Sequence, residues 1–305
     1  MSEVEKWIAD SAMNACLMEV LSPKPGNVYP GAEWNFHDLK VIDFIRSSRS
    51  IRSAFSNISN YRFGELILNT IIETRKVTST NTNLGQVLLL APLAYTFLNY
   101  GAISVELIAE FISQLTVKDS RDVYQAIRLA KPGGMGDVNS EDLGDDPTLP
   151  LNQIMQLASS YDSVAKQYAN HFQDVLGLGL NSILIESNAS DDWRDMIVSS
   201  HLHFMADLPD TLIARKCGWK VAEDSAKMAK SVIQRPTRSA EYLEELKSLD
   251  QWLRVEGNQR NPGTTADLVT ATIFVALIQK MINVPEELES MVNLQIKVAG
   301  ANENG

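Results

Sequence analysis

The sequence predicts an all-α fold, built as a single multi-helix globular domain. Apolar residues recur at helical spacing along nearly the whole chain, whereas the alternation typical of half-buried strands is almost absent. Proline and glycine stand between these periodic runs, and only Pro92 lies inside one, where we expect a kink. No change of composition marks a boundary. We therefore expect one domain over residues 1–298 and a frayed tail over residues 299–305.

Each expected helix rests on its own apolar stripe. The first helix carries such a stripe at Trp7, Ile8, Met13, Cys16, Leu17 and Val20. Further helices are expected at about 38–55, 63–75, 84–99, 105–115, 121–130, 162–176, 193–207, 211–217, 221–233, 240–255, 265–282 and 285–298. Ser182-Ile183-Leu184-Ile185 is the only strand candidate. Residues 133–150 form the longest irregular stretch, which is typical of a functional loop.

Composition excludes several classes of function. With 27 basic and 38 acidic residues the net charge is −11, which argues against a nucleic-acid partner. Cys16 and Cys217 lie far apart without metal-type spacing, as expected of thiols in a reducing compartment. The N-terminus lacks a signal-peptide core, and the apolar runs are too short to span a bilayer. We expect a cytoplasmic protein without a membrane partner; a homo-oligomer is compatible with the sequence.

The segment Arg260–Leu268 is the most informative stretch of the chain. It places a Pro262-Gly263 turn and two threonines, Thr264 and Thr265, directly before a long apolar helix, with Asp267 in its first turn. A carboxylate next to residues that look fully buried is costly unless it is paired, which suggests a functional role. The alternative is that Thr264 caps the helix and Asp267 closes a variant of the capping box.

Two earlier turns carry groups that suit an anion. Three prolines and two glycines make residues 22–31 rigid, and Lys24 on this turn suits phosphate oxygens, together with Gly26 and Asn27. The alternative is a plain connector with a solvated lysine. The turn at 80–85 offers Asn81 and Asn83 just before an apolar helix, where helix starts bind anions. Redundant helix capping is the alternative there.

Three later segments complete the set of candidate residues. Residues 131–137 are rich in glycine (Gly133, Gly134) but follow no strand and precede no helix, so they match no dinucleotide or Walker fingerprint. This segment is either a phosphate-covering loop or a linker. The other two segments pair Asp162 with Lys166, and Asp210 with Arg215 and Lys216, in arrangements that are also standard for a surface pair and for a helix start.

The acidic residues as a group indicate a magnesium–polyphosphate site. Hard oxygen ligands would hold the metal, while amides and ammonium groups would hold the phosphates. The candidate metal ligands are Asp38, Asp137 and Asp162. The four histidines, at positions 37, 171, 201 and 203, do not form a zinc motif. We expect Lys24, Asn81, Asp210 and Asp267 to converge on one cleft.

Taken in order, these segments resemble the triphosphoribosyl-dephospho-CoA synthase family. The matching pieces are Lys24-Pro25-Gly26-Asn27-Val28, Asn81-Thr82-Asn83-Leu84-Gly85, Asp210 to Gly218, and Pro262 to Leu268. They span roughly residues 12 to 280. Where the family usually reads Asn-Thr-His-Lys-Gly, this chain has Asn83 and Leu84 at the third and fourth places.

The resemblance implies an all-helical enzyme that transfers the triphosphoribosyl group of ATP to the ribose 2′-hydroxyl of dephospho-CoA, with adenine leaving. Asp210 and Asp267 would be the catalytic residues, acting on the cationic sugar or on Mg²⁺. The residues that would bind ATP and its phosphates are Lys24, Gly26, Asn27, Asn81, Asn83, Gly133, Gly134, Lys216, Thr264 and Thr265. Three alternatives stay open: a related ribosyl transferase for another cofactor, such as a pterin, a glycohydrolase that uses water as the acceptor, and a non-catalytic nucleotide-binding protein.

Overall fold

The computed structural model describes residues 1–32, 39–133 and 141–303, and this part of the chain contains helices and no strand, which confirms the all-α fold class. In the first half the helices are α1 (Glu3–Leu21), α2 (Val41–Phe55), the short η2 (Ile58–Asn60), α3 (Phe63–Val77), α4 (Leu84–Tyr100), α5 (Val105–Ser113), α6 (Val117–Ala130) and α7 (Leu151–Ala158). In the second half they are α8 (Ser163–Ala169), the π-helical η3 (Val175–Gly179), α9 (Leu180–Ser187), α10 (Trp193–Asp207), α11 (Thr211–Cys217), α12 (Trp219–Ile233), α13 (Ala240–Leu253), α14 (Val255–Asn258), α15 (Gly263–Ile278) and α16 (Leu288–Glu303).

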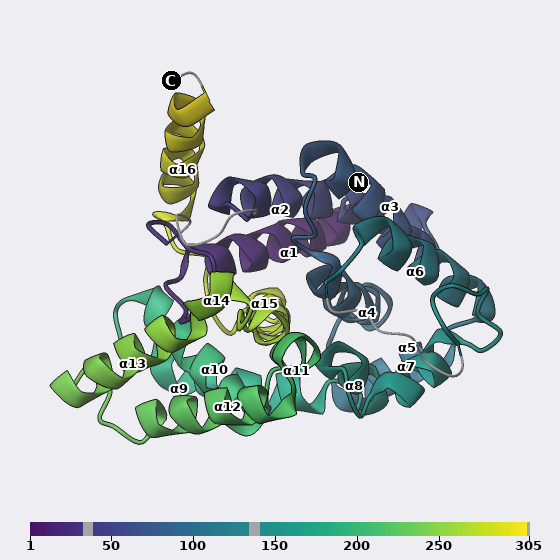
Figure 1. Ribbon diagram of the computed structural model, residues 1–305. Coiled ribbons are helices and arrows are strands. Elements are labelled where there is room, and N and C mark those ends of the chain that lie inside the picture. Colours follow the sequence, from purple (N-terminus) through teal and green to yellow (C-terminus); the bar gives the residue numbers. More distant parts are fainter. Residues whose placement is uncertain (33–38, 134–140, 304–305) are drawn as a thin grey trace.

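The other helices are arranged around α15, which runs through the centre of the molecule and is seen almost end-on in Figure 1. From Thr264 to Ile278 every residue of α15 is buried except Asp267. A helix that is apolar on all sides needs neighbours on all sides, and α1, α4 and α10 supply them. One hydrophobic core therefore surrounds α15, and a single acid interrupts it.

A second, smaller hydrophobic cluster lies between α10, α11, α12 and α13, at the lower left of Figure 1. Its fully buried members include Ile213, Val232 and Leu249. This cluster anchors α11 through Ile213 and Ala214. The α16 helix, by contrast, projects away from the body (Figure 1).

The strand candidate at residues 182–185 is wrong, because these residues lie in α9. Ile183 is fully buried whereas Ile185 is 70% exposed. Residues two apart share a face in a strand and lie on opposite faces of a helix, so this burial pattern is helical. A run of three apolar residues is too short for its period to be read reliably.

Other boundaries differ from the expected ones. The expected helix at 162–176 is divided into α8 and η3, with His171 and Phe172 in left-handed conformation between them. The helix α7 was not expected. The tail expected from residue 299 is the end of α16 as far as Glu303. Among the described residues no single helix meets the length and hydropathy needed to cross a membrane; only the bent pair of α4 and α5 meets them together.

Candidate active site

A cleft of about 910 Å³ opens beside α15. The starts of α4, α8 and α15 and the ends of α1, α6 and α11 surround it. Six of the residues expected to bind nucleotide or to act on it line this cleft: Asn81, Asn83, Gly133, Lys216, Thr264 and Asp267. One expected metal ligand, Asp162, also lines it. One wall is apolar and is formed by α6 and α7, with Val123, Ile127, Leu151, Ile154 and Met155.

Asp267 lies at the floor of the cleft, partly exposed. No hydrogen bond or ion pair joins its carboxylate to another described residue. The helix α15 begins at Gly263 with Pro262 as N-cap and without a side-chain cap, so the capping box considered for Thr264 and Asp267 does not form. Burial raises the pKa of Asp267 well above its usual range, and the nearby acids Glu19, Asp210 and Asp162 raise it further.

Gly85 allows the carboxylate of Asp267 to approach the start of α4. A Cβ atom added at Gly85 would lie 1.9 Å from Oδ2 of Asp267 and 2.6 Å from its Cγ. The first amides of a helix have no partner within the helix, and they carry partial positive charge. The positive end of α4 therefore faces an acid that no side chain has neutralised. Gln86 ties the two helices together by donating from Nε2 to Oγ1 of Thr270, at 3.1 Å.

Glu19 is a buried acid at the cleft that sequence reasoning missed. It is 3% exposed, in the last turn of α1, and it lines the cleft. Lys24 lies behind it with no exposed surface, and its Nζ is 3.0 Å from Oε1 of Glu19. The Lys24 ammonium also donates to the backbone oxygens of Glu19 and Ser22. Lys24 is thus not among the described residues that line the cleft.

A visible signal could have pointed to Glu19. It is the only charged residue in the apolar run Leu17-Met18-Glu19-Val20-Leu21, directly before the turn that carries Lys24. Burial raises the pKa of Glu19 and lowers that of Lys24, and each charge opposes the shift of the other.

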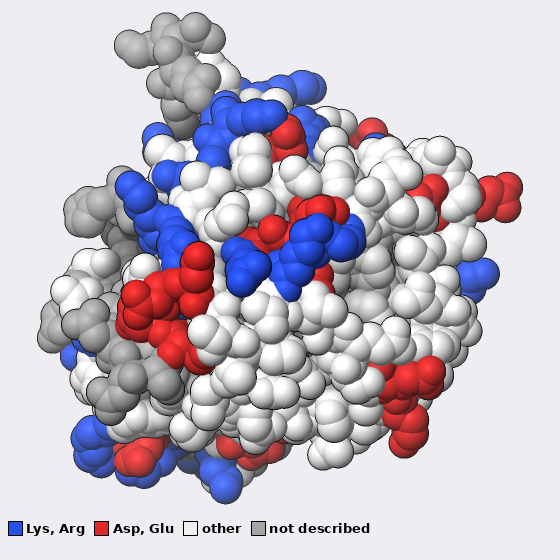
Figure 2. Space-filling model, turned by 90° about the vertical axis from the view of Figure 1, so that its right-hand side faces the viewer, with Lys and Arg blue, Asp and Glu red and all other residues white. Residues whose placement is uncertain are grey.

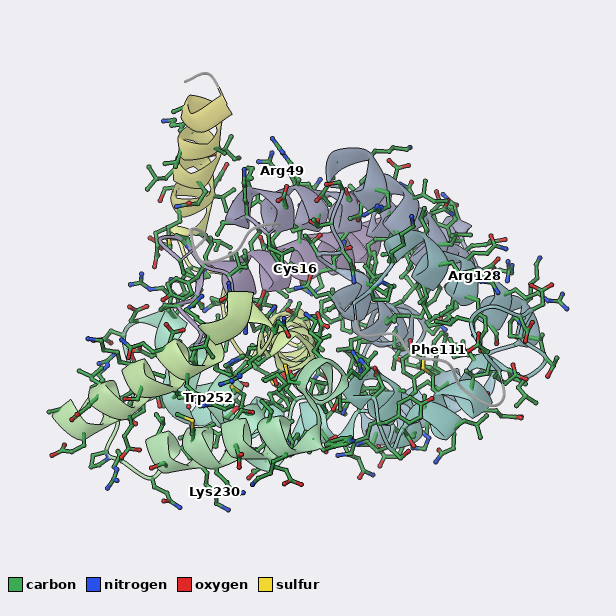
Figure 3. The ribbon with its side chains drawn as sticks, viewed as in Figure 1. Cys16, Arg49, Phe111, Arg128, Lys230 and Trp252 are labelled. Atoms are coloured by element: carbon green, nitrogen blue, oxygen red, sulfur yellow. The ribbon has the colours of Figure 1, made fainter. Side chains whose placement is uncertain are left out.

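Cys16, one turn earlier on α1, lies in the middle of the molecule, whereas Arg49 and Lys230 lie at its outer surface (Figure 3).

Asp210 lies beneath the cleft, and its hydrogen bonds hold two helix starts in place. Its Oδ1 accepts hydrogen bonds from the amides of Leu212 (2.8 Å) and Ile213 (3.0 Å), at the start of α11. Its Oδ2 accepts from the amide (2.7 Å) and the hydroxyl (2.8 Å) of Thr265. Asp210 therefore caps α11 and holds the start of α15. It is only 2% exposed, and Thr265 is equally buried.

Thr211 connects a third helix start to the same point. Its hydroxyl accepts from the amide of Ser163, at the start of α8 (3.1 Å), and donates to the hydroxyl of Thr264 at 3.4 Å. The starts of α8, α11 and α15 are thus joined by short side chains. This arrangement fixes the position of Asp267 relative to the rest of the cleft.

The asparagines at the start of α4 also have defined partners. Oδ1 of Asn81 accepts from the amide of Leu84, the first residue of α4, at 3.2 Å. Nδ2 of Asn83 donates to the hydroxyl of Thr74 at 2.9 Å. Both residues line the cleft, and each keeps polar atoms that these two bonds do not use.

Among the described residues, the basic side chains that line the cleft are Arg75, which lies beside the asparagine turn, and Lys131, Arg215 and Lys216. Lys216 is exposed, and a Cβ added at Gly133 would lie 3.5 Å from its Cε. Nη1 of Arg215 is 2.6 Å from Oδ2 of Asp162, whose Oδ1 caps α8. Asp162 thus has both oxygens engaged. Lys131, the left-handed C-cap of α6, is exposed and also lines the cleft.

The part of the turn at 22–31 that carries Gly26 packs against α13, and only Val28 of this turn lines the cleft. The amide of Gly26 donates to Oδ1 of Asp250 at 2.7 Å. Gly26 has a φ of 74°, and a Cβ there would lie 2.8 Å from Leu253, so glycine suits this position. Arg254 donates to the backbone oxygen of Asn27 at 2.9 Å. Neither Gly26 nor Asn27 is among the described residues that line the cleft.

Three expected site residues, Asp38, Gly134 and Asp137, lie outside the described residues. Within residues 1–32, 39–133 and 141–303 there is no group of three or more histidine, cysteine or acidic side chains that could hold a metal ion. The four residues predicted to converge on one cleft therefore do not all line it. Asn81 and Asp267 line the cleft, Asp210 lies beneath it, and Lys24 reaches it only through Glu19.

The comparisons with known proteins agree with these motifs. Residues 5–285 match the family of ATP:dephospho-CoA triphosphoribosyl transferases. A crystal structure from Archaeoglobus fulgidus, provisionally described as a triphosphoribosyl-dephospho-CoA synthase, is similar with a TM-score of 0.61. The two chains are 24% identical, and the similar region covers 78% of this chain and 98% of that one. At this identity the likeness supports the fold.

No curated protein sequence shows significant similarity to this chain. The family match nevertheless covers most of its length and includes both the Lys24 turn and the start of α15. The chain therefore belongs to the ATP:dephospho-CoA triphosphoribosyl transferase family, enzymes that transfer the triphosphoribosyl group of ATP to dephospho-CoA.

Proposed function

We propose that the cleft beside α15 is where the triphosphoribosyl group is transferred, and that Asp267 acts at the anomeric carbon. The observation that supports this most is the carboxylate of Asp267. It lies on the cleft floor without a partner among the described residues, against the positive end of α4. Cleavage of the bond to adenine passes through a cationic sugar and needs a proton for the purine. A carboxyl group with a raised pKa suits that proton transfer.

For the triphosphate we propose a position between the start of α4 and the end of α11. Asn81 and Asn83 would offer amide groups from one side, and Lys216 and Gly133 an ammonium group and a backbone amide from the other. Thr264 would contact the ribose or the first phosphate. Four expected site residues would not contact the substrate and would instead hold the cleft in shape. Asp210 and Thr265 would fix the starts of α11 and α15, and Gly26 and Asn27 would fix the turn at 22–31.

Magnesium is expected with ATP, although the described residues do not form a resident metal site. Asp162, the candidate ligand among them, already caps α8 and binds Arg215. Magnesium often reaches a protein mainly through substrate phosphates. We propose that the ion enters as part of magnesium–ATP, and no step of the mechanism is derived through it.

The wider assignments rest on composition and are proposals as well. A cytoplasmic location fits two free cysteines, Cys16 and Cys217. Nucleotides are the expected partners. On the face shown in Figure 2, lysines and arginines gather in separate clusters beside acidic ones, unlike the continuous basic stripe of many nucleic-acid-binding proteins. The comparisons favour neither the pterin-related alternative nor the non-catalytic one.

Adenine release from magnesium–ATP, measured with and without dephospho-CoA, tests the function. We expect release that depends on dephospho-CoA, and a fall of at least about 100-fold in Asp267→Asn, because the variant cannot supply the proton or the charge. Asp191→Asn, an exposed acid before α10, is the matched control and should keep full activity. A wild-type protein that never releases adenine would overturn the function. Normal turnover in Asp267→Asn would overturn the site.

A further inference from the structure

The Glu19–Lys24 pair joins the cleft to a fully buried cation. Glu19 lines the cleft, whereas Lys24 has no exposed surface and directs its ammonium at Glu19 and at two backbone oxygens. An ammonium group has three donors, and all three of these contacts are inside the protein. Lys24 therefore has no donor left for a phosphate. Its charge can act on the cleft only through Glu19.

We propose that Glu19 is a second catalytic carboxylate, which takes the proton of the attacking hydroxyl, and that Lys24 is the positioning residue that holds it. This inference rests on the proposed function of the cleft. It gives Lys24 a positioning role in place of the phosphate contact expected from the sequence, and it assigns different roles to Glu19 and Asp267. Glu19 has a cation bound to it, whereas Asp267 has none within hydrogen-bonding distance among the described residues.

The proposed step balances as follows. The bond between C1′ of ATP and N9 of adenine breaks, and its electron pair goes to adenine, which takes a proton from the Asp267 carboxyl group. The 2′-oxygen of the acceptor bonds to C1′ and gives its proton to Glu19. Solvent then returns a proton from Glu19 to Asp267. Two carboxyl groups in different environments can divide acid and base work in this way.

The charged groups around the two acids favour this division. Glu19 is in contact with Lys24, and His201 on α10, which also faces Lys24, stays neutral because burial and that lysine lower its pKa to about 3. Asp267 faces Glu19 from α1, Asp162 from the start of α8, and Asp210 from the start of α11. Arg215 opposes these acids, but it is bound to Asp162. The negative charge around Asp267 favours its protonated form.

The test uses Glu19→Gln, Lys24→Met and the double variant, each assayed for adenine release and for melting temperature. Removing one partner of a buried ion pair leaves the other charge uncompensated, so each single variant should melt lower. Replacing both partners should restore much of the melting temperature. If the pair is only structural, activity returns with it. If Glu19 is catalytic, the double variant stays at least about 100-fold slower than wild type.

The pH profile separates positioning by Lys24 from phosphate binding. Without the lysine the pKa of Glu19 rises, so in Lys24→Met the acidic limb of kcat should move to higher pH while KM for ATP changes little. A raised KM with an unmoved limb would mean that Lys24 contacts the triphosphate, and would overturn the inference. Lys220→Met breaks the exposed Lys220–Asp224 pair on α12 and is the matched control, with unchanged activity expected.

The two proposals can fail separately. If the wild-type protein releases adenine and Asp267→Asn does not, the proposed function stands. Activity near that of wild type in the refolded double variant then overturns only the role of Glu19. If Lys24→Met does not fold, Glu19→Gln and the double variant still decide the question, because the double variant carries no unpaired buried charge at this position.

Discussion

The starts of α11 and α15 lie side by side and each carries an aspartate, but the two carboxylates are used in opposite ways. Asp210 accepts hydrogen bonds from the backbone amides of Leu212, Ile213 and Thr265 and from the Thr265 hydroxyl. Asp267 accepts none from a described residue and lies at the cleft. The difference follows from position along the helix. Asp210 precedes α11 as its N-cap, whereas Asp267 lies four residues after the first residue of α15, beyond the unpaired amides.

This contrast shows how a fold can separate stability from chemistry. A carboxylate that is surrounded by helix amides stabilises two helix starts and is not available to a ligand. A carboxylate that the fold leaves without partners costs stability, and it persists where function requires it. Each of the following predictions would break or sharpen this comparison.

The largest effect is expected from Gly85→Ala, which acts on Asp267 without changing it. The new methyl group would overlap Oδ2 of Asp267, and the carboxylate would have to rotate away from the start of α4. Because the atom displaced is the end of a side chain, the fold should persist while adenine release falls by about 100-fold. Gly300→Ala in α16, where a Cβ meets nothing within 4 Å, is the control. Full activity in Gly85→Ala would show that the position of Asp267 is not critical.

A stability loss of about 2–3 kcal/mol is expected from Asp210→Asn. One carboxylate oxygen becomes an NH₂ group that faces backbone donors, so buried amides of α11 or α15 lose their acceptor. Chemical unfolding measures this loss. Asp192→Asn at the start of α10 is the matched control, because asparagine caps equally well and the ion pair of Asp192 with Arg194 in the same helix is exposed and contributes little. An Asp210→Asn variant as stable as wild type but inactive would reverse the roles assigned to the two aspartates.

The smallest effect is expected from Asp267→Asn, whose free energy of unfolding should be about 1 kcal/mol higher than that of wild type at neutral pH. The pKa of Asp267 is raised in the folded protein, so its contribution to stability is present below the ordinary carboxyl pKa. That contribution is lost as pH rises through the raised value. Asparagine does not titrate. The variant should therefore gain stability relative to wild type as pH rises above the ordinary carboxyl pKa of about 4. A difference that does not change with pH would mean that Asp267 is not perturbed.

The sequence alone determined the class of fold and most of the helices, because apolar spacing reports which face of a helix is buried. It also marked the start of α15, where one acid interrupts a fully apolar helix. It failed at residues 182–185, where three apolar residues in a row do not show a period. The family, too, was readable from the Lys24 turn and the Asp267 segment, and the comparisons confirm it.

Only the tertiary structure decided which charged groups face the cleft. Lys24 on its proline-rich turn was expected to meet phosphate, yet it is buried behind Glu19. Asp210 and Asp267 look alike in sequence, and the partner that distinguishes them, Thr265, is 55 residues away from Asp210. Local patterns reveal where a helix begins and which residues are acidic. Whether the charge of a carboxylate is neutralised by contacts within the protein depends on which helix starts pack together. That packing is a long-range property of the fold.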